Sequence, residues 1–287
     1  MVDTVWKLNG GRTLGPASFF IAGVVNVTPD SFYDGGEHAS TAKALEHAVA
    51  LTAQGADILD IGGESTRPYA PPVSLDMELT RVVPVVEQVI AMKLVGPDGA
   101  EVQPIISVDT YKAGVASRVL EAGAAIINDV SACAFDPELI DVLGQYKPGY
   151  VLMHSRGRPE DMQDAPLYYD VVDSLMAFFE KHLKKLQQAG LPAERIVLDP
   201  GIGFGKTMEH NFQILQNIER FMSFGFPIYM GLSNKSLWQG LLGLGPDERG
   251  NSTQVATALL AARGVAIHRV HDVKLTRQSL TIVGEMA

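Results

Sequence analysis

The sequence predicts an α/β fold, a single-domain (β/α)8 TIM barrel over residues 1–287 with an N-terminal β-hairpin. Short apolar runs recur along the chain, and each is followed by a glycine or polar turn and then by a stretch with helical periodicity. This strand-then-helix unit occurs eight times without a linker or a second-domain break, which favours a closed barrel. A doubly wound open sheet is the structural alternative.

The positions of these runs give the expected elements. Strands are expected at residues 19–27, 58–61, 105–108, 125–128, 150–153, 196–198, 227–231 and 266–270. Helices are expected at residues 41–54, 77–91, 112–122, 137–143, 171–189, 211–221, 253–263 and from 273 onward. Before the first strand, residues 6–8 and 12–14 flank Asn9-Gly10-Gly11, which is a strong hairpin signal. We expect this hairpin to cover the N-terminal end of the barrel.

The composition excludes several classes of function. Hydrophobic residues make up 46% of the chain and charged residues 20%, so we expect a sizeable core and little disorder. The formal net charge of −10 argues against a nucleic-acid partner, because phosphate binding needs a basic surface. The single cysteine, Cys133, excludes an internal disulfide and is expected to be a packed thiol. Neither a membrane-spanning run nor a secretory signal is evident, so no membrane partner and a cytoplasmic location are expected.

Polar side chains gather at the predicted C-terminal ends of the strands, where barrels of this type place their active sites. In chain order they are Asn26, Asp60, the segment 64–67, Asp109, Asn128, His154, Asp199, Lys235, Arg269 and His271. Because a packed interior does not tolerate unpaired charge, each of these side chains must meet a partner or a ligand. The carboxylates suit a heterocycle with N–H donors, and the cations suit a phosphate or pyrophosphate.

Each of these residues also has an ordinary structural interpretation. Asp109 could cap the helix that starts after it, and Asp199 could form a simple turn with the Pro-Gly pair that follows. Lys235 and His271, taken alone, are more often surface residues. The glycine-rich segment 201–205 lacks the lysine–serine pair of a Walker motif, so a close backbone approach to a ligand is the better interpretation. Their coincidence at one end of the barrel favours a functional site.

Eight motifs occur in the order that one enzyme family shows. They are GVVNVTPDSF at residues 23–32 with DGG at 34–36, DIGGESTRP at 60–68, SVDT at 107–110, INDVS at 127–131, LMH at 152–154, LDPGIGFGK at 198–206, SNKS at 233–236 and RVHD at 269–272. Together they resemble the dihydropteroate synthase family over most of the chain. The resemblance implies condensation of 6-hydroxymethyl-7,8-dihydropterin pyrophosphate with p-aminobenzoate. The implied reaction is an SN1-like displacement that yields 7,8-dihydropteroate and pyrophosphate and needs no protein nucleophile.

The resemblance also implies roles for individual residues. The implied pterin ligands are Asp109, Asn128, Asp199 and Lys235, with Met153 and Phe204 packed near the ring. The implied pyrophosphate ligands are Asn26, Arg269 and His271, with Mg²⁺ as the cofactor that bridges Asn26 and phosphate oxygens. The implied p-aminobenzoate pocket comprises Phe32, Thr66, Arg67, Pro68 and Ser236, and the implied catalytic residues are Asp30, Lys235, Arg269 and His271. The family further implies a homodimer and a target of sulfonamides.

The chain departs from the family pattern at two places. Asn234 stands where the family usually has an arginine before the pocket lysine. Arg156 and Arg158 stand where the family more often has uncharged residues. The missing cation would weaken anion capture at the mouth of the site unless one of these two arginines replaces it.

Two other functions remain open at this point. A methyltetrahydrofolate-dependent corrinoid methyltransferase has a similar pterin domain, but it has no pyrophosphate to expel. In that enzyme Asn26, Lys235, Arg269 and His271 would have no shared task. A paralogue that binds a pterin without catalysis is the second alternative, and Asn234 is the feature that keeps it open.

Overall fold

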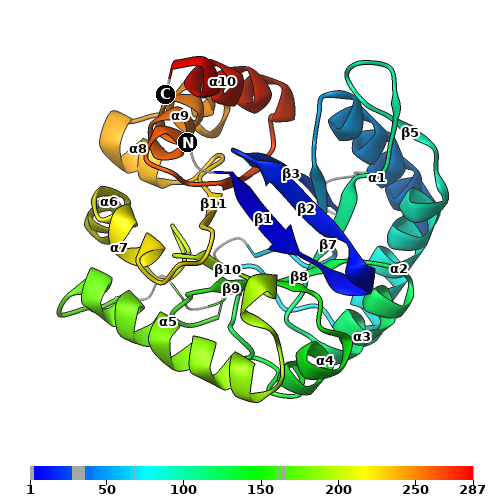
Figure 1. The fold of residues 1–287 in the computed structure, drawn as a ribbon, viewed down its shortest axis with the longest axis horizontal. Helices are drawn as coiled ribbons and strands as arrows, with labels where there is room; N and C mark the ends of the chain where they lie inside the picture. The colour runs from blue at the N-terminus through cyan, green and yellow to red at the C-terminus, as the bar shows by residue number, and fades with distance from the viewer. Residues whose placement is uncertain are drawn as a thin grey trace.

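The computed structural model describes residues 3–27, 36–66, 69–158, 160, 162 and 166–286, and its centre is a barrel of parallel strands surrounded by helices (Figure 1). The barrel strands are β3 (Phe20–Asn26), β4 (Ile58–Gly62), β7 (Ile105–Asp109), β8 (Ile126–Asp129), β9 (Gly149–Met153), β10 (Ile196–Asp199), β11 (Tyr229–Gly231) and β12 (Ile267–Val270). Their order is β10-β9-β8-β7-β4-β3-β12-β11, and a parallel bridge between Leu198 and Ile228 joins the two ends. This arrangement confirms the (β/α)8 barrel and excludes the doubly wound sheet.

Helices follow every barrel strand. They are α1 (Gly36–Ala53), α2 (Leu75–Ala91), α3 (Ala113–Glu121), α4 (Leu139–Tyr146), α5 (Val171–Gln188), α6 (Met208–Gln216), α7 (Ile218–Met222), α8 (Leu237–Leu242), α9 (Gly250–Ala262) and α10 (Val273–Met286). The single helix expected at 211–221 is wrong, because the chain breaks at Asn217, whose φ of −113° and ψ of 28° are not helical. The short helix α8 and the small hairpin of β5 (Leu94–Val95) and β6 (Glu101–Val102) were not predicted. Within the described part of the chain, no helix is long and apolar enough to cross a membrane.

The helices form where apolar side chains recur on one face. In α5 the residues Leu175, Phe179 and Leu183 are spaced four apart, and all three are buried against the barrel. The helix starts at Asp170, whose carboxylate accepts a hydrogen bond from the backbone N–H of Asp173 at 2.8 Å. The periodicity and the cap together explain why this helix was predicted almost to the residue.

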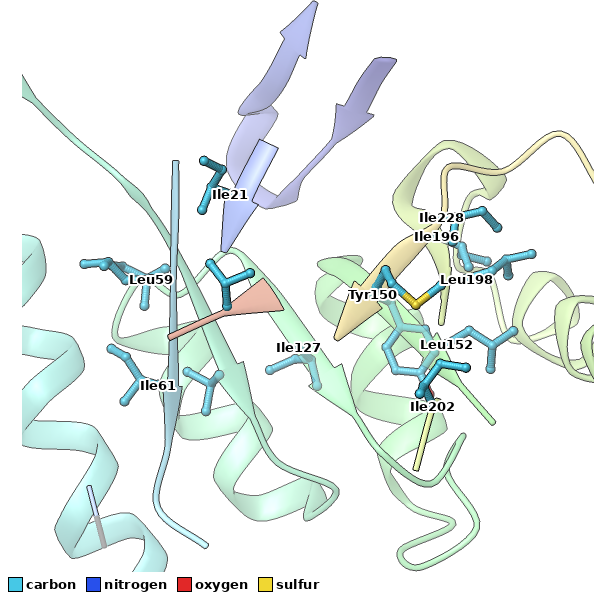
Figure 2. Close-up of a cluster of buried hydrophobic side chains, with 14 of the residues drawn as sticks. Ile21, Leu59, Ile61, Ile127, Tyr150, Leu152, Ile196, Leu198, Ile202 and Ile228 are labelled. Carbon is cyan, nitrogen blue, oxygen red and sulfur yellow. The ribbon is translucent and has the colours of Figure 1, made fainter. Parts of the chain in front are cut away.

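Alternate residues of each strand point outward to the helices or inward to the barrel axis. The outward set, part of which Figure 2 shows, includes Ile21, Leu59, Ile61, Ile127, Leu152 and Leu198. The inward set near the start of the strands includes Phe20, Ile58, Ile126, Val151, Val197 and Ile267. Two positions after Ile58, Ile126, Val197 and Ile267 come Asp60, Asn128, Asp199 and Arg269. The barrel interior therefore has an apolar lower layer and a polar upper layer, and the polar layer is at the C-terminal ends of the strands.

The N-terminal hairpin closes the lower end of the barrel, as predicted. It consists of β1 (Thr4–Lys7) and β2 (Thr13–Ala17), which are joined by a short 3-10 turn at Asn9–Gly11. Figure 1 shows both strands lying across the barrel. Trp6 and Leu8 are fully buried against the lower inward set, and Trp6 Nε1 donates to the backbone carbonyl of Arg195 at 2.8 Å. This lid leaves the opposite end of the barrel for a site.

Candidate active site

Arg269 connects polar residues from three other strands in the upper layer of the barrel. Its Nε donates to Asp60 Oδ2 at 2.6 Å, and its Nη2 donates to Asp109 Oδ2 at 2.8 Å. Asp60 is fully buried and also accepts hydrogen bonds from Ser107 Oγ at 2.6 Å and from Asn128 Nδ2 at 3.1 Å. Charge-assisted hydrogen bonds of this kind are strong and directional. One buried network therefore orients both Asp109 and Asn128.

Burial changes the ionisation of this network. It raises the pKa of Asp109 to about 7, and the Arg269 cation only partly opposes the shift because the Asp60 carboxylate acts with burial. For Arg269, burial favours the neutral form, but Asp60 and Asp109 outweigh burial and raise the pKa of the guanidinium. The result is a permanent cation next to a carboxyl group that changes charge near neutral pH. A ligand that donates an N–H to Asp109 would favour its ionised form.

Asp199 and Lys235 belong to another wall of the same cavity. Asp199 Oδ1 accepts a hydrogen bond from the backbone N–H of Gly201 at 2.7 Å. Burial raises the pKa of Asp199 to about 6, and the Gly201 N–H and the cations Lys235 and Lys206 limit the rise. Burial lowers the pKa of Lys235 to about 8, although Asp199 favours its charged form. Lys235 Nζ lies 4.2 Å from the centre of the Phe204 ring, which is cation–π distance.

These walls surround a cavity at the C-terminal end of the barrel. Its lining residues are Thr66, Asp109, Asn128, Val130, Met153, Asp199, Gly201, Ile202, Phe204, Gly231, Lys235 and Arg269. Eight of the predicted site residues are among them, namely Thr66, Asp109, Asn128, Met153, Asp199, Phe204, Lys235 and Arg269. Side chains that are up to 203 residues apart in the sequence (Thr66 and Arg269) thus meet at one place.

The other predicted site residues lie outside this lining or outside the described residues. Asn26 is half-buried at the end of β3, and His271 and Ser236 are exposed. The ring of His271 is positioned by Ser233, whose Oγ lies 2.9 Å from Nδ1. Ser236 immediately precedes α8. Four predicted residues, Asp30, Phe32, Arg67 and Pro68, fall outside the described residues.

The strand-end residues differ in how far they have an ordinary structural role. Asp109 does not cap α3, because the helix starts at Ala113, whose backbone N–H donates to Asp136 Oδ2 at 2.8 Å. Asp199 combines both interpretations, since one of its oxygens forms the turn with Gly201 while the residue also lines the cavity. Lys235 is half-buried over Phe204 and lines the cavity, so it is not a solvated surface lysine.

Sequence reasoning gave no role to two buried charged residues of this region. Asp60 was placed among the polar strand residues, yet it is the residue that pairs with Arg269 and Asn128. A signal was available, because Asp60 is two positions after Ile58 and therefore shares its inward direction. Lys206 is also buried, and no pattern in the sequence indicates its burial.

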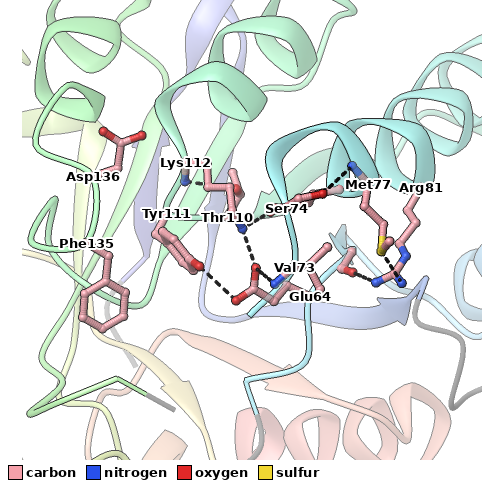
Figure 3. Close-up of polar contacts among 12 residues, drawn as sticks. Glu64, Val73, Ser74, Met77, Arg81, Thr110, Tyr111, Lys112, Phe135 and Asp136 are labelled. Atoms are coloured by element: carbon pink, nitrogen blue, oxygen red, sulfur yellow. Dashed lines mark hydrogen bonds and ion pairs between the residues drawn. The ribbon is translucent and has the colours of Figure 1, made fainter. Parts of the chain in front are cut away.

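A second ion-pair network fixes the segment after β4 (Figure 3). Lys112 Nζ forms ion pairs with Glu64 and Glu78. Glu64 also accepts hydrogen bonds from Tyr111 Oη at 3.0 Å and from the backbone N–H of Val73 at 3.3 Å. Burial raises the pKa of Glu78, and Lys112 opposes that rise. Glu64 thus holds its own strand end and Val73 against the residues that precede α3.

The region of Asn234 differs from what the sequence suggested. Asn234 has a positive φ of 59°, and its backbone carbonyl accepts a hydrogen bond from Arg249 Nη1 at 3.0 Å. Arg156 instead lies over the ring of Tyr168 at 5.1 Å, and Arg158 donates to a backbone carbonyl of the β8–α4 loop at 3.4 Å. The cation that contacts Asn234 is therefore Arg249, which neither motif nor spacing had indicated.

The cavity is suited to recognise a flat polar heterocycle. The carboxylates of Asp109 and Asp199 can accept paired N–H donors, and Lys235 can donate to a carbonyl oxygen. Met153 and Phe204 offer apolar contact to the faces of such a ring.

Two further observations concern nucleophilic and metal-binding side chains. Burial raises the pKa of the Cys133 thiol to about 12, so it is not a thiolate at neutral pH. In the part of the chain that the structure describes, no group of three or more His, Cys, Asp or Glu side chains could hold a metal ion.

Comparison with known proteins gives a consistent result. Residues 22–271 match the model of a family described as pterin binding enzyme. The chain is 39% identical over 273 residues to the dihydropteroate synthase of Escherichia coli K12. This alignment covers 95% of this chain and 93% of that protein. The dihydropteroate synthase of Yersinia pestis, solved with a sulfonamide drug, aligns with a TM-score of 0.89 at 37% identity over 99% of both chains.

A third relative has been solved with two informative ligands. The dihydropteroate synthase of Xanthomonas albilineans with 4-aminobenzoic acid aligns with a TM-score of 0.89 at 38% identity, over 99% of this chain and 98% of that one. The same enzyme in complex with 7,8-dihydropteroate aligns with a TM-score of 0.86 at 36% identity, over 99% and 98% of the two chains.

Asp109→Asn is expected to stabilise the unliganded protein at pH 8. Because the pKa of Asp109 is raised, the stability that this carboxyl group contributes is complete below about pH 4 and is lost as the pH rises through 7. Asparagine keeps an oxygen for Arg269 but removes the buried charge. The free energy of unfolding should rise by roughly 1 kcal/mol at pH 8 and hardly change at pH 5, as measured by urea unfolding. An equal change at both pH values would contradict the assignment.

Proposed function

The chain belongs to the dihydropteroate synthase family of pterin-binding enzymes, and from this membership we propose how its own residues condense 6-hydroxymethyl-7,8-dihydropterin pyrophosphate with p-aminobenzoate. The observation that carries the proposal is the convergence of Asp109, Asn128, Asp199 and Lys235 on one cavity. The complexes of the Xanthomonas relative with 4-aminobenzoic acid and with 7,8-dihydropteroate support the same substrate classes here.

The pterin ring binds in the cavity between its two polar walls. Asp199 keeps one oxygen on Gly201 and uses the carboxylate edge to accept the ring N–H and the exocyclic amino group. Lys235 donates to the carbonyl side of the ring, while Asp109 and Asn128 meet the opposite edge. Both acids must be ionised to accept these bonds, and ligand N–H donors favour that form.

The displacement proceeds through loss of pyrophosphate. The bond between the pterin methylene carbon and the pyrophosphate oxygen breaks, and its electron pair leaves with the oxygen. Arg269 and His271 neutralise the developing negative charge, and Asp30 stabilises the cation that remains on the pterin methylene. The amine nitrogen of p-aminobenzoate then attacks this carbon and loses a proton. No covalent bond to the protein forms in these steps.

Asn26 fits a role as a single amide-oxygen ligand for Mg²⁺. It is half-buried at the C-terminal end of β3, on the face of the barrel that carries the cavity. Mg²⁺ binds through few protein ligands together with waters and substrate phosphates, so the donor set fits an ion that arrives with the pyrophosphate. When bound, Mg²⁺ would supply further neutralisation of the leaving group.

The amine substrate binds nearer the mouth of the cavity. Thr66 lines the cavity on this side. The family resemblance assigns Phe32, Arg67 and Pro68 to the same substrate, and these three residues lie outside the described part of the chain. Ser236 meets the carboxylate. Sulfonamides resemble p-aminobenzoate, and the Yersinia pestis relative in complex with a sulfonamide drug supports the proposal that they compete for this pocket.

The two alternatives explain fewer of the observations. A methyltransferase would leave the cationic side chains of Lys235, Arg269 and His271 without a common task. The non-catalytic alternative rests on Asn234 in place of the family's arginine, but this substitution changes none of the side chains that line the cavity. The two readings still differ in one measurable way, because a binder holds the pterin pyrophosphate without releasing pyrophosphate.

A homodimer is part of the proposal. Large apolar side chains are exposed on α8, α9 and α10, which lie near one another in Figure 1. They are Leu241, Leu242, Val255, Leu259 and Ile282, each more than half exposed. A second copy of the chain would cover such a surface. The cytoplasmic location stays a prediction from the sequence.

Turnover tests the proposed activity and the role of Asp199 together. Pyrophosphate release from the pterin substrate with Mg²⁺ and p-aminobenzoate should yield dihydropteroate and should fall by a factor of about 100 or more in Asp199→Asn. An exposed aspartate on α4 supplies the matched control, Asp141→Asn, which should be unaffected. Chelation of Mg²⁺ should also slow the release. Tight pterin binding without pyrophosphate release would support the non-catalytic binder instead.

The oligomeric state tests the apolar surface. Leu259→Lys, at a side chain that is 63% exposed on α9, should shift the protein from dimer to monomer in analytical ultracentrifugation, because it places a charge in an apolar interface. Leu167→Lys is the control, since Leu167 is 74% exposed but lies in the β9–α5 loop. A monomeric unmodified protein would contradict the proposal.

A further inference from the structure

Lys206 is a buried lysine that the steps described so far do not use. It ends the glycine-rich loop between β10 and α6, and it is only 3% exposed. Four acceptors surround its ammonium group. They are the Nδ1 of His154 at 2.9 Å and the backbone carbonyls of His154 at 3.2 Å, Gly201 at 2.9 Å and Phe204 at 3.0 Å. A compact cation with three N–H donors suits this group of acceptors.

This group of acceptors joins two loops of the active site. His154 follows β9, and its backbone N–H donates to the carbonyl of Asp199 at 3.0 Å. Gly201 and Gly205 have φ values of 67° and 60°, and a Cβ at either position would overlap a backbone carbonyl of the β9–α5 loop. The two loops therefore touch through their backbones, and the ammonium group binds carbonyls from both.

The residues that Lys206 holds are the ones that form the pterin wall. The backbone N–H of Gly201 donates a hydrogen bond to Asp199 Oδ1 at 2.7 Å. Gly201, Ile202 and Phe204 line the cavity, and Phe204 lies beneath Lys235. The carbonyls of Gly201 and Phe204 both point to the Lys206 ammonium, so removal of that group would release this loop at two of its cavity residues.

Lys206 also contributes charge. The groups that act on Asp199 are the Gly201 N–H, Lys206 from its own loop, Lys235 from the loop after β11, and Arg269 from β12. His154 from β9 stays neutral, because burial and Lys206 lower its pKa to about 2, and it therefore accepts a hydrogen bond rather than adding charge. Burial lowers the pKa of Lys206 to about 7, and Asp199 opposes this shift.

We infer that Lys206 is a positioning residue for pterin binding: its buried ammonium group holds the 201–205 loop against His154 and thereby fixes Asp199 and Phe204 in the pterin wall. This inference rests on the proposed function, since it assigns a task in binding of the same pterin substrate. Lys206 acts through Asp199 and Phe204 and does not itself line the cavity.

The test compares three variants with the unmodified protein. Lys206→Met removes the ammonium group and keeps the length of the side chain. His154→Phe removes one acceptor but keeps the ring that packs edge-on against Phe178 at 4.7 Å, and it keeps the Lys206 charge. Lys184→Met is the matched control, because Lys184 is exposed on α5. Circular dichroism checks the fold, calorimetry measures dihydropterin pyrophosphate binding across pH, and pyrophosphate release gives kcat and KM.

The inference predicts different results for each variant. Lys206→Met should raise both the dissociation constant and KM by about tenfold, as loss of charge-assisted hydrogen bonds does. The pH below which affinity falls, which we call the acid limb of binding, should also rise by about one unit in this variant, because Asp199 loses a cation that favours its ionised form. His154→Phe should weaken binding by a smaller factor and leave the acid limb in place. Lys184→Met should match the unmodified protein in every measurement.

Three outcomes would overturn the inference. They are unchanged binding in Lys206→Met, weaker binding by the same factor at every pH, and unchanged binding in His154→Phe. If Lys206→Met does not fold, Lys206→Gln keeps amide donors without charge and must show the same shift of the acid limb. Failure of the proposed function is distinguishable, because the unmodified protein would then neither bind the pterin substrate nor release pyrophosphate.

Discussion

The guanidinium of Arg269, held between Asp60 and Asp109, is the interaction on which the rest of the site depends. It joins β12 to β4 and β7 in the upper layer of the barrel, and through Asp60 it also reaches Asn128 on β8. A buried cation of this kind must be paired, and a carboxylate that faces it gains a fixed direction. Asp109 and Asn128, which we propose bind the pterin, are thus placed before any substrate arrives, which is the preorganisation that recognition of a rigid ring requires.

The buried charged groups of the site lower the stability of the fold. Burial raises the pKa of Asp109 and Asp199 and lowers the pKa of Lys206 and Lys235, so burial makes the charged form of each group less favourable than it is in water. The apolar layer below and the outer contacts between strands and helices must offset this cost. A pterin substrate with N–H donors and a carbonyl would favour the charged forms of these groups. Part of the binding free energy would therefore offset the cost of burying their charges.

The periodicity of the sequence predicted the barrel because each strand and most helices have strong local signals. The break at Asn217, the short helix α8 and the β5–β6 hairpin escaped prediction, since elements of two to six residues have too little periodicity. Motif residues such as Asp109, Asn128 and Asp199 were predicted because they end strands. The pairing of Asp60 with Arg269, 209 residues away in the sequence, and the burial of Lys206 depend on closure of the barrel and have no local signal. The same holds for Arg249 beside Asn234.

The affinity of Asp60→Asn for dihydropterin pyrophosphate is the most direct test of this account. Asp60 is fully buried and does not line the cavity, so it affects binding indirectly, through its hydrogen bonds with Arg269 and Asn128 and through the effect of its charge on Asp109. Asparagine keeps the size of the side chain and removes the charge that holds the guanidinium. The account predicts a folded protein whose dissociation constant, measured by calorimetry, is raised by about tenfold or more. An unchanged dissociation constant in a folded variant would contradict it.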